Sequence, residues 1–239
     1  MPDPTETQRP LARLRPGTPL GELVTYEVCR EAANLFMTGM FGYETINRDR
    51  VPPSGPVLIV ANHESFLDPT IIGSRVRHRQ LDYVARASLF KPPFARVLHA
   101  IHAFPIADKG DDIAAMKEAL RRLGEGRAVV IFPEGSRTFD GTMQPFKRGA
   151  GLIIKRANCM VLPAAIAGAF RAWPRNSKLP RFRAARVGVA FGHPIPPQEL
   201  RSLGSGAIDR LQHEVQALRG TLAQHGIGSV SDAPAGSGR

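Results

Sequence analysis

A histidine and an aspartate, His63 and Asp68, stand five positions apart directly after the apolar run 57–61. Histidine accepts a proton at neutral pH because its unperturbed pKa is about 6.5, and a nearby carboxylate orients the ring and stabilises the imidazolium. The spacing therefore predicts a general base with its orienting acid, which needs no covalent nucleophile. Asp68-Pro69 is also typical of a helix start, with aspartate as the N-cap and proline in the first turn. Both interpretations hold together, because an N-cap aspartate is rigidly placed.

A second polar cluster, Phe-Pro-Glu-Gly-Ser-Arg at 132–137, follows the apolar run 128–131. Glu134 and Arg137 cannot both be ordinary core residues, because a buried unpaired charge is costly. They must pair with each other, meet solvent or meet a ligand. The planar fork of arginine suits phosphate oxygens, so Arg137 is the first choice for phosphate recognition. A structural Glu134–Arg137 ion pair is the alternative.

Two weaker signals lie elsewhere in the chain. Lys147 and Arg148 open a helix-like segment, where free backbone N–H groups and two cations attract anions, although a solvated basic turn is the more common explanation of such a pair. His99 and His102 are three positions apart, but no third ligand has a convincing spacing, so no metal site is expected. The glycine-rich signatures of P-loop and dinucleotide-binding proteins do not occur, nor does a serine-hydrolase elbow.

The two clusters resemble the motifs Asn-His-x-x-x-x-Asp and Phe-Pro-Glu-Gly-Thr-Arg of the glycerophospholipid acyltransferase family, with Ser136 in the threonine position. The segment 161–166, which contains Pro163, resembles a third landmark of that family, and the resemblance covers residues 46 to about 195. Related sequences often carry an arginine after Phe-Pro-Val-x. Here 104–107 runs into Asp108, and Lys109 takes the arginine's place only with a shift of one residue.

The resemblance implies transfer of a fatty acyl group from acyl-CoA or acyl carrier protein to the hydroxyl of 1-acyl-glycerol 3-phosphate, which gives phosphatidic acid. No metal or redox cofactor is implied. His63 would be the base and Asp68 its orienting acid. The predicted substrate-binding residues are Glu134, Gly135, Ser136, Arg137, Lys109, Lys147 and Arg148. Two alternatives stay open: a related acyltransferase that acts on glycerol 3-phosphate, lyso-ornithine lipid or another lysolipid, and a non-enzymatic basic protein that binds anionic membrane or nucleic acid.

The chain has 239 residues, a net charge of +11 and an isoelectric point near 10.6. Such charge attracts polyanions, among them nucleic acid, an anionic membrane surface, acidic substrates and acidic carriers. No zinc-finger or RNA-recognition signature occurs, so a nucleic-acid partner is not expected. Six cations crowd the stretch 171–186, which is either a solvated loop or a patch that faces lipid headgroups. Cys29 and Cys159 do not suggest a disulfide framework and suit a reducing compartment.

Membrane association is predicted to be peripheral and on the cytoplasmic side. The N-terminus lacks the apolar core of a signal peptide, and the longest uncharged runs are too short to span a bilayer. Apolar residues between Leu20 and Phe36 recur with helical spacing, followed by an apolar tip that is expected to be exposed. This amphipathic helix either packs on the core or lies at the membrane interface. The tip consists of Met37, Met40, Phe41 and Tyr43.

The remaining pattern predicts an α/β fold, a single acyltransferase domain with a mixed sheet flanked by helices. We expect a flexible tail at 1–19, the amphipathic helix within 20–45, the domain at 46–225 and a second flexible tail at 226–239. Strands are predicted at 57–61, 81–85, 128–132, 161–167 and 186–191. Helices are predicted at 69–76, 93–101, 111–123, 148–157 and 205–224.

Overall fold

The computed structural model describes residues 19–92, 94–106, 112–182 and 185–228. Lys109 and the greater part of both predicted tails lie outside these residues. A seven-stranded sheet with the order β1-β7-β6-β2-β5-β3-β4 forms the centre. All neighbouring strands are parallel except β6 and β7, so the predicted mixed sheet is confirmed. The strands are β1 (Glu44–Ile46), β2 (Val57–Ala61), β3 (Leu81–Arg86), β4 (Ala103–Ile106), β5 (Ala128–Ile131), β6 (Met160–Ala167) and β7 (Gly188–Phe191).

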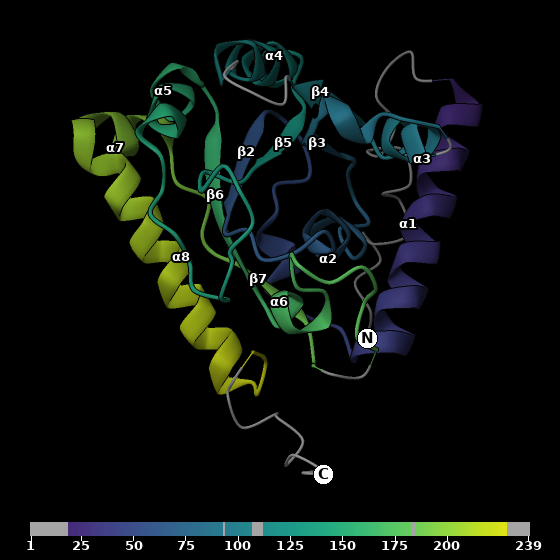
Figure 1. Ribbon diagram of the computed structural model, residues 1–239. Helices are drawn as coiled ribbons and strands as arrows, with labels where there is room; N and C mark the ends of the chain where they lie inside the picture. The colour runs from purple at the N-terminus through teal and green to yellow at the C-terminus, as the bar shows by residue number, and fades with distance from the viewer. Residues whose placement is uncertain (1–18, 93, 107–111, 183–184, 229–239) are drawn as a thin grey trace, which may run out of the picture.

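Helices cover both faces of the sheet (Figure 1). One layer contains α1 (Leu20–Phe41), α2 (Asp68–Gly73), α3 (Phe94–Ala100) and α6 (Ala169–Ala172). The other contains α4 (Asp112–Gly124), α5 (Arg148–Arg156), α7 (Pro197–Ser202) and α8 (Ala207–Gln224). Three short 3₁₀ helices, Arg48–Arg50, Ala87–Leu89 and Gly204–Gly206, connect these elements.

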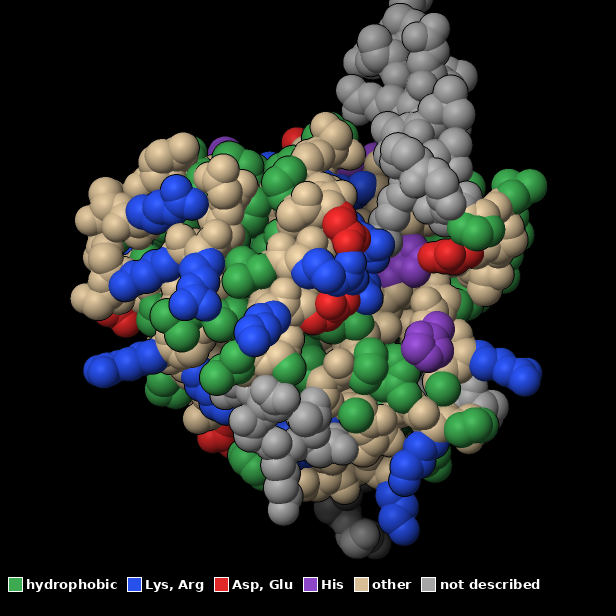
Figure 2. Space-filling model, turned by 90° about the horizontal axis from the view of Figure 1, so that it is seen from above, with side chains coloured by type: hydrophobic (Ala, Val, Ile, Leu, Met, Phe, Trp, Pro, Cys, Tyr) green, Lys and Arg blue, Asp and Glu red, His purple; other side chains and the backbone are tan. Residues whose placement is uncertain are grey.

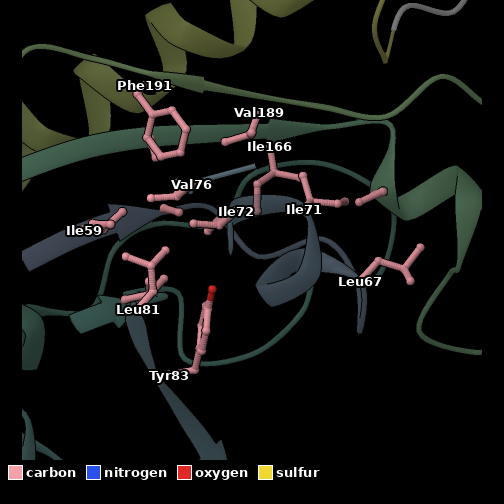
Figure 3. Close-up of a cluster of buried hydrophobic side chains, with 14 of the residues drawn as sticks. Ile59, Leu67, Ile71, Ile72, Val76, Leu81, Tyr83, Ile166, Val189 and Phe191 are labelled. Atoms are coloured by element: carbon pink, nitrogen blue, oxygen red, sulfur yellow. The ribbon is translucent and has the colours of Figure 1, made fainter. Parts of the chain in front are cut away.

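Both faces of the central strands are buried, which explains why β2 and β5 read as continuous apolar runs instead of alternating patterns. Ile59 and its neighbours on the same side of the sheet join a cluster with α2 (Figure 3). Within this cluster the hydroxyl of Tyr83 lies against Gly73. A Cβ atom at Gly73 would come within 1.9 Å of that hydroxyl, so only glycine fits there.

The N-terminal helix forms as α1, but its predicted exposed tip is wrong. Met37, Phe41 and Tyr43 are buried, and Met40 alone of the four remains exposed. The tip is buried because the end of α1 packs over α2, where the Tyr43 hydroxyl donates a hydrogen bond to the backbone oxygen of Ile71. The side of α1 that faces solvent instead carries Leu20, Val24, Val28, Leu35 and Phe36. Helical spacing alone could not decide which of two apolar arcs packs inward.

The strand predicted at 57–61 is found with these bounds as β2, and the other predicted elements are found with shifts of one to three residues at their ends, as in β7, which begins at Gly188, and α2, which ends at Gly73. Four short elements were not predicted: β1, β4, α6 and α7. The two strands lie at the edges of the sheet and have three and four residues, too few for a periodic pattern. Within the described ranges, no helix is both long and apolar enough to cross a bilayer.

Candidate active site

The two polar clusters meet because β2 and β5 are parallel neighbours in the sheet. The carboxyl ends of parallel neighbours lie at the same edge, which is where α/β proteins place their ligands. Two backbone contacts join the loops that follow these strands. The His63 amide donates to Glu134 Oε1 at 2.7 Å, and the Thr138 amide donates to the His63 carbonyl at 2.9 Å. The backbone of His63 is therefore held on both sides by the second cluster.

His63 and Asp68 form the predicted contact, with 2.6 Å between His63 Nδ1 and Asp68 Oδ2. Asp68 is completely buried, whereas the imidazole is partly exposed. An ionised carboxylate only accepts hydrogen bonds, so Nδ1 carries the proton and Nε2 keeps its lone pair. This tautomer is the one that a general base needs.

Asp68 does not cap α2 as predicted. The N-cap position is Leu67, which makes no side-chain capping bond, and Asp68 is the first helical residue. Its Oδ2 atom accepts the backbone N–H groups of Glu64 and Ser65 at 2.6 and 2.9 Å, in addition to the imidazole. The carboxylate thus turns back to the loop before the helix, because that loop offers three donors at one point.

Two further side chains, to which the sequence assigned no role, position this loop. The Phe132 ring stacks on the His63 ring with 4.2 Å between centroids and 15° between planes. The Asn62 side chain continues the pairing of β2 with β6: its Nδ2 donates to the Ile166 carbonyl, and its Oδ1 accepts the Ile166 amide. The motif residues around His63 therefore serve its placement as well as its chemistry.

Glu134 lies at the centre of the contact between the clusters and is buried. Besides the His63 amide it accepts the Gln144 amide at 2.8 Å, and burial raises the pKa of its carboxyl. No ion pair joins it to Arg137 in the described part of the chain. Gly135 has φ +71°, a conformation that favours glycine, and the Lys147 side chain lies directly over it.

Arg137 carries a guanidinium group that forms no ion pair with a described residue, although the charge of Asp68 acts on it. Its Cζ atom lies 3.4 Å from the centroid of the Phe66 ring, and its Nη1 atom is buried without a hydrogen-bond partner among the described residues. Burial lowers the pKa of Arg137, and the nearby cations of Arg175 and Arg86 lower it further. Arg175 also donates to the Arg137 carbonyl at 3.1 Å. A site with unpaired cations and a free donor is suited to an anion.

Sequence reasoning missed Glu64, which is buried beside the catalytic candidate. Its carboxylate accepts the Phe170 amide at 3.1 Å and forms a 3.2 Å ion pair with Arg219 of α8. Burial raises the Glu64 pKa to about 7, even though Arg219 opposes the shift. Glu64 therefore ties the His63 loop to the start of α6 and to α8. The partners are 106 and 155 positions away in sequence, so no local signal identifies them.

The structure thus brings His63, Asp68, Glu134, Arg137 and Lys147 to one edge of the sheet. Ser136 is half-buried in the same loop as Gly135, and Arg148 lies on the exposed face of α5. Arg86 and Arg175 join the predicted set from β3 and from the basic stretch. Among the described residues, no group of three or more His, Cys, Asp or Glu side chains could hold a metal ion.

An open α/β sheet with a histidine base and unpaired arginines at its carboxyl edge is typical of an enzyme that deprotonates an anionic substrate. The chain belongs to the acyltransferase family, since a family model described as Acyltransferase matches residues 43–167. It is 27% identical over 194 residues to the 1-acyl-sn-glycerol-3-phosphate acyltransferase of Bacillus subtilis (strain 168), covering 81% of this chain and 92% of that protein.

A human relative named 1-acyl-sn-glycerol-3-phosphate acyltransferase alpha is 27% identical over 186 residues, which are 74% of this chain and 63% of that protein. The fold also matches the crystal structure of the 1-acyl-sn-glycerophosphate (LPA) acyltransferase, PlsC, from Thermotoga maritima, with a TM-score of 0.69. That match has 21% identity and covers 92% of this chain and 84% of the other. The predicted family and fold are therefore confirmed.

Proposed function

We propose that this protein transfers a fatty acyl group from a thioester donor, acyl-CoA or acyl carrier protein, to the hydroxyl of 1-acyl-glycerol 3-phosphate. The product is phosphatidic acid. The proposal rests on one observation, which joins two contacts in the same loop. His63 Nδ1 lies 2.6 Å from Oδ2 of the buried Asp68, and the Phe66 ring between these two residues stacks on the guanidinium group of Arg137. One half of this site suits a hydroxyl that must lose a proton, and the other suits a phosphate. The names of the relatives support the same substrate.

His63 Nε2 removes the hydroxyl proton as the acceptor oxygen attacks the thioester carbonyl. Asp68 holds the ring and stabilises the imidazolium that forms. When the tetrahedral intermediate collapses, the carbon–sulfur bond breaks, and the thiolate takes the proton from His63. The backbone N–H groups of Ser136 and Arg137 donate to no acceptor in the described structure and lie close in sequence to Thr138, which bonds His63. They are the donors that we assign to the oxyanion.

Phosphate recognition falls to Arg137, supported by the charges of Arg86 and Arg175. A phosphate monoester presents several oxygens that a guanidinium fork can bind in a bidentate manner. Lys147, which lies over Gly135, adds a further cation to the second loop. This arrangement favours a phosphate monoester over an acceptor without phosphate.

The test is a thioester-release assay on the full chain with a panel of acceptors. The panel comprises 1-acyl-glycerol 3-phosphate, glycerol 3-phosphate, lyso-ornithine lipid and a lysophospholipid that is a phosphodiester. The highest kcat/KM is expected with 1-acyl-glycerol 3-phosphate. A preference for another acceptor would move the protein to one of the related acyltransferases. Absence of turnover with every acceptor would support a basic binding protein instead.

We also propose that the protein acts from the cytoplasmic surface of the membrane, because its acceptor partitions into bilayers. The solvent-facing side of α1 carries exposed Val24, Val28 and Leu35, which suits an element lying at the lipid interface. The basic stretch adjoins this helix through an edge contact of 6.2 Å between Phe182 and Phe36. Leu179 and Phe182 are exposed there beside exposed Lys178 and Arg181. Free Cys29 and Cys159 suit a reducing compartment.

Vesicle co-sedimentation tests this docking surface. Replacing Val28, Leu35 and Phe36 by Ser should reduce binding to anionic vesicles and lower activity on vesicle-bound acceptor more than on a short-chain analogue. The matched control is Ile113→Ser, which removes an exposed apolar side chain from α4 in the other layer. Met37 and Phe41 are unsuitable targets because their loss would disturb the core. Equal binding by the wild type and the triple variant would exclude α1 as the membrane contact.

A further inference from the structure

The helix that begins at the active site, α5, exposes cations that no acidic side chain in the described part of the chain neutralises. Lys147, Arg148, Lys155 and Arg156 are exposed, and none forms an ion pair with a described residue. The stretch 147–156 contains no Asp or Glu. Arg201 of α7 adds a cation at its end, where it donates to the Ala157 carbonyl and to the Asn158 side chain.

The neighbouring helix α4 is organised differently. Its Arg121 pairs with Glu118 and Glu125, and its Arg122 pairs with Glu118 and with buried Asp82. Figure 2 shows this contrast: blue and red side chains are interleaved near the centre of the face, whereas the blue side chains of its left part, where Figure 1 places α5, stand among tan and green atoms with red only at the edge. The positive charge of α5 therefore remains available to a partner.

The exposed face of α5 also has the composition of a docking surface. Positions 148, 152, 155 and 156 lie on one side of the helix, and Leu152 at its middle is 48% exposed. The opposite side is anchored in the core by Ile153 and Ile154. Nine residues give a face about 13 Å long. This row of positive charges with an apolar residue at its centre suits an acidic helix of a partner protein. The phosphates of a nucleotide would instead require cationic groups that converge on one point.

The position of α5 argues against the bilayer as its partner. It contacts α4, α7 and α8, whereas α1 contacts α2 and α3 on the other face of the sheet (Figure 1). A membrane that rests on α1 would leave the outer face of α5 in water. The N-terminal end of α5, however, adjoins the candidate active site, because the Lys147 amide donates a hydrogen bond to the Pro133 carbonyl at 2.9 Å. The charged face thus leads from solvent to the second loop of the site.

We propose that the exposed face of α5 docks an acidic acyl carrier protein, whose thioester-linked acyl group then enters the site at the His63 loop. This inference rests on the proposed acyl transfer and names its donor. In this step the acceptor oxygen forms the new ester bond, the carrier thiolate leaves, and the proton passes from the hydroxyl through His63 to sulfur. The attraction of opposite charges orients the carrier, and Leu152 supplies the apolar contact at the centre of the interface.

The experiment compares two donors with the same chain length, palmitoyl-acyl carrier protein and palmitoyl-CoA, on the full protein. The variant is Lys155→Glu/Arg156→Glu, which reverses two cations at the end of α5 that is farther from the site. We expect its KM for the carrier to rise at least tenfold, while its kcat/KM with palmitoyl-CoA changes less than twofold. Lys155→Arg/Arg156→Lys should retain carrier use. The matched control is Arg48→Glu/Arg96→Glu, which reverses two exposed cations that form no ion pair with a described residue and lie on elements with no substantial contact to α5.

Each outcome decides between the partners. Equal losses with both donors would overturn the carrier interface and indicate binding of the CoA phosphates. Unchanged kinetics with both donors, or loss of anionic-vesicle binding alone, would also overturn it. If the wild type accepts palmitoyl-CoA and rejects the palmitoyl carrier, this inference fails and the proposed function stands. If it accepts neither donor with any acceptor, the proposed function itself fails.

Discussion

The two halves of the active site differ in how their polar groups are held. On the base side, Asp68 Oδ2 and Glu134 accept the imidazole and four backbone amides, which fix His63, and Asp68 Oδ1 alone is buried without a hydrogen-bond partner among the described residues. On the recognition side, Arg137 has a buried donor without a partner, and its cationic neighbours disfavour its charge. In the proposed mechanism, the geometry of the base is therefore built into the fold, whereas the arginine side would be completed by the anionic substrate.

Breaking the base side should have the largest effect. His63→Ala removes general-base assistance, which typically contributes 10²- to 10⁴-fold, and kcat should fall by that order with little change in acceptor KM. Asp68→Asn should also lower kcat, because an amide can donate to Nδ1 and favour the wrong tautomer. Steady-state kinetics on proteins with unchanged circular dichroism is the measurement. Near-wild-type turnover by His63→Ala would exclude the mechanism.

Breaking the recognition side should act on substrate use instead. Arg137→Ala is expected to lower kcat/KM for the phosphate-bearing acceptor by about 10- to 100-fold, as the loss of charge-assisted hydrogen bonds costs about 1.5–3 kcal/mol. Arg137→Lys should rescue only part of this, because lysine keeps the charge and loses the fork and the stack on Phe66. Titration of acceptor at saturating donor distinguishes the three proteins. Equal kinetics would remove Arg137 from the site.

A substitution of Glu64 tests whether the contact of this buried carboxyl with α8 contributes to the stability of the base side. The Glu64 pKa is about 7 in the folded protein and about 4.3 in the unfolded chain, so between these pH values the folded state holds the additional proton. Stability from this group is therefore lost as pH rises from about 4 to 7, by about 1.4 kcal/mol per unit. Glu64→Gln should make the unfolding free energy less dependent on pH between 5 and 7 in urea titrations. Glu199→Gln, an exposed glutamate on α7, is the control and should leave the dependence unchanged.

The base side could be predicted from sequence because its main pair is local. His63 and Asp68 lie within one loop, and the apolar runs before both clusters identified the strands that carry them. The partners of Glu64 and Asn62 could not be predicted, since they come from α6, α8 and β6 through the order of the strands. The prediction of which side of α1 is exposed was wrong for a related reason. Two sides of this helix carry apolar residues, and only its packing against α2 selects the side that is buried.

The smallest expected effect concerns the supporting cations, and it sharpens the role of Arg137. Arg86 is exposed and has no ion pair with a described residue, so its contribution to phosphate attraction is screened by salt. Arg86→Gln should raise the acceptor KM severalfold at low ionic strength and much less at physiological salt. Arg175→Gln should keep part of its effect at high salt, because Arg175 also bonds the Arg137 carbonyl and stacks over Phe139 at 4.2 Å. Acceptor KM measured across a salt series separates attraction by charge from support of the Arg137 backbone. Identical salt profiles for the two variants would mean that Arg175 contributes charge alone.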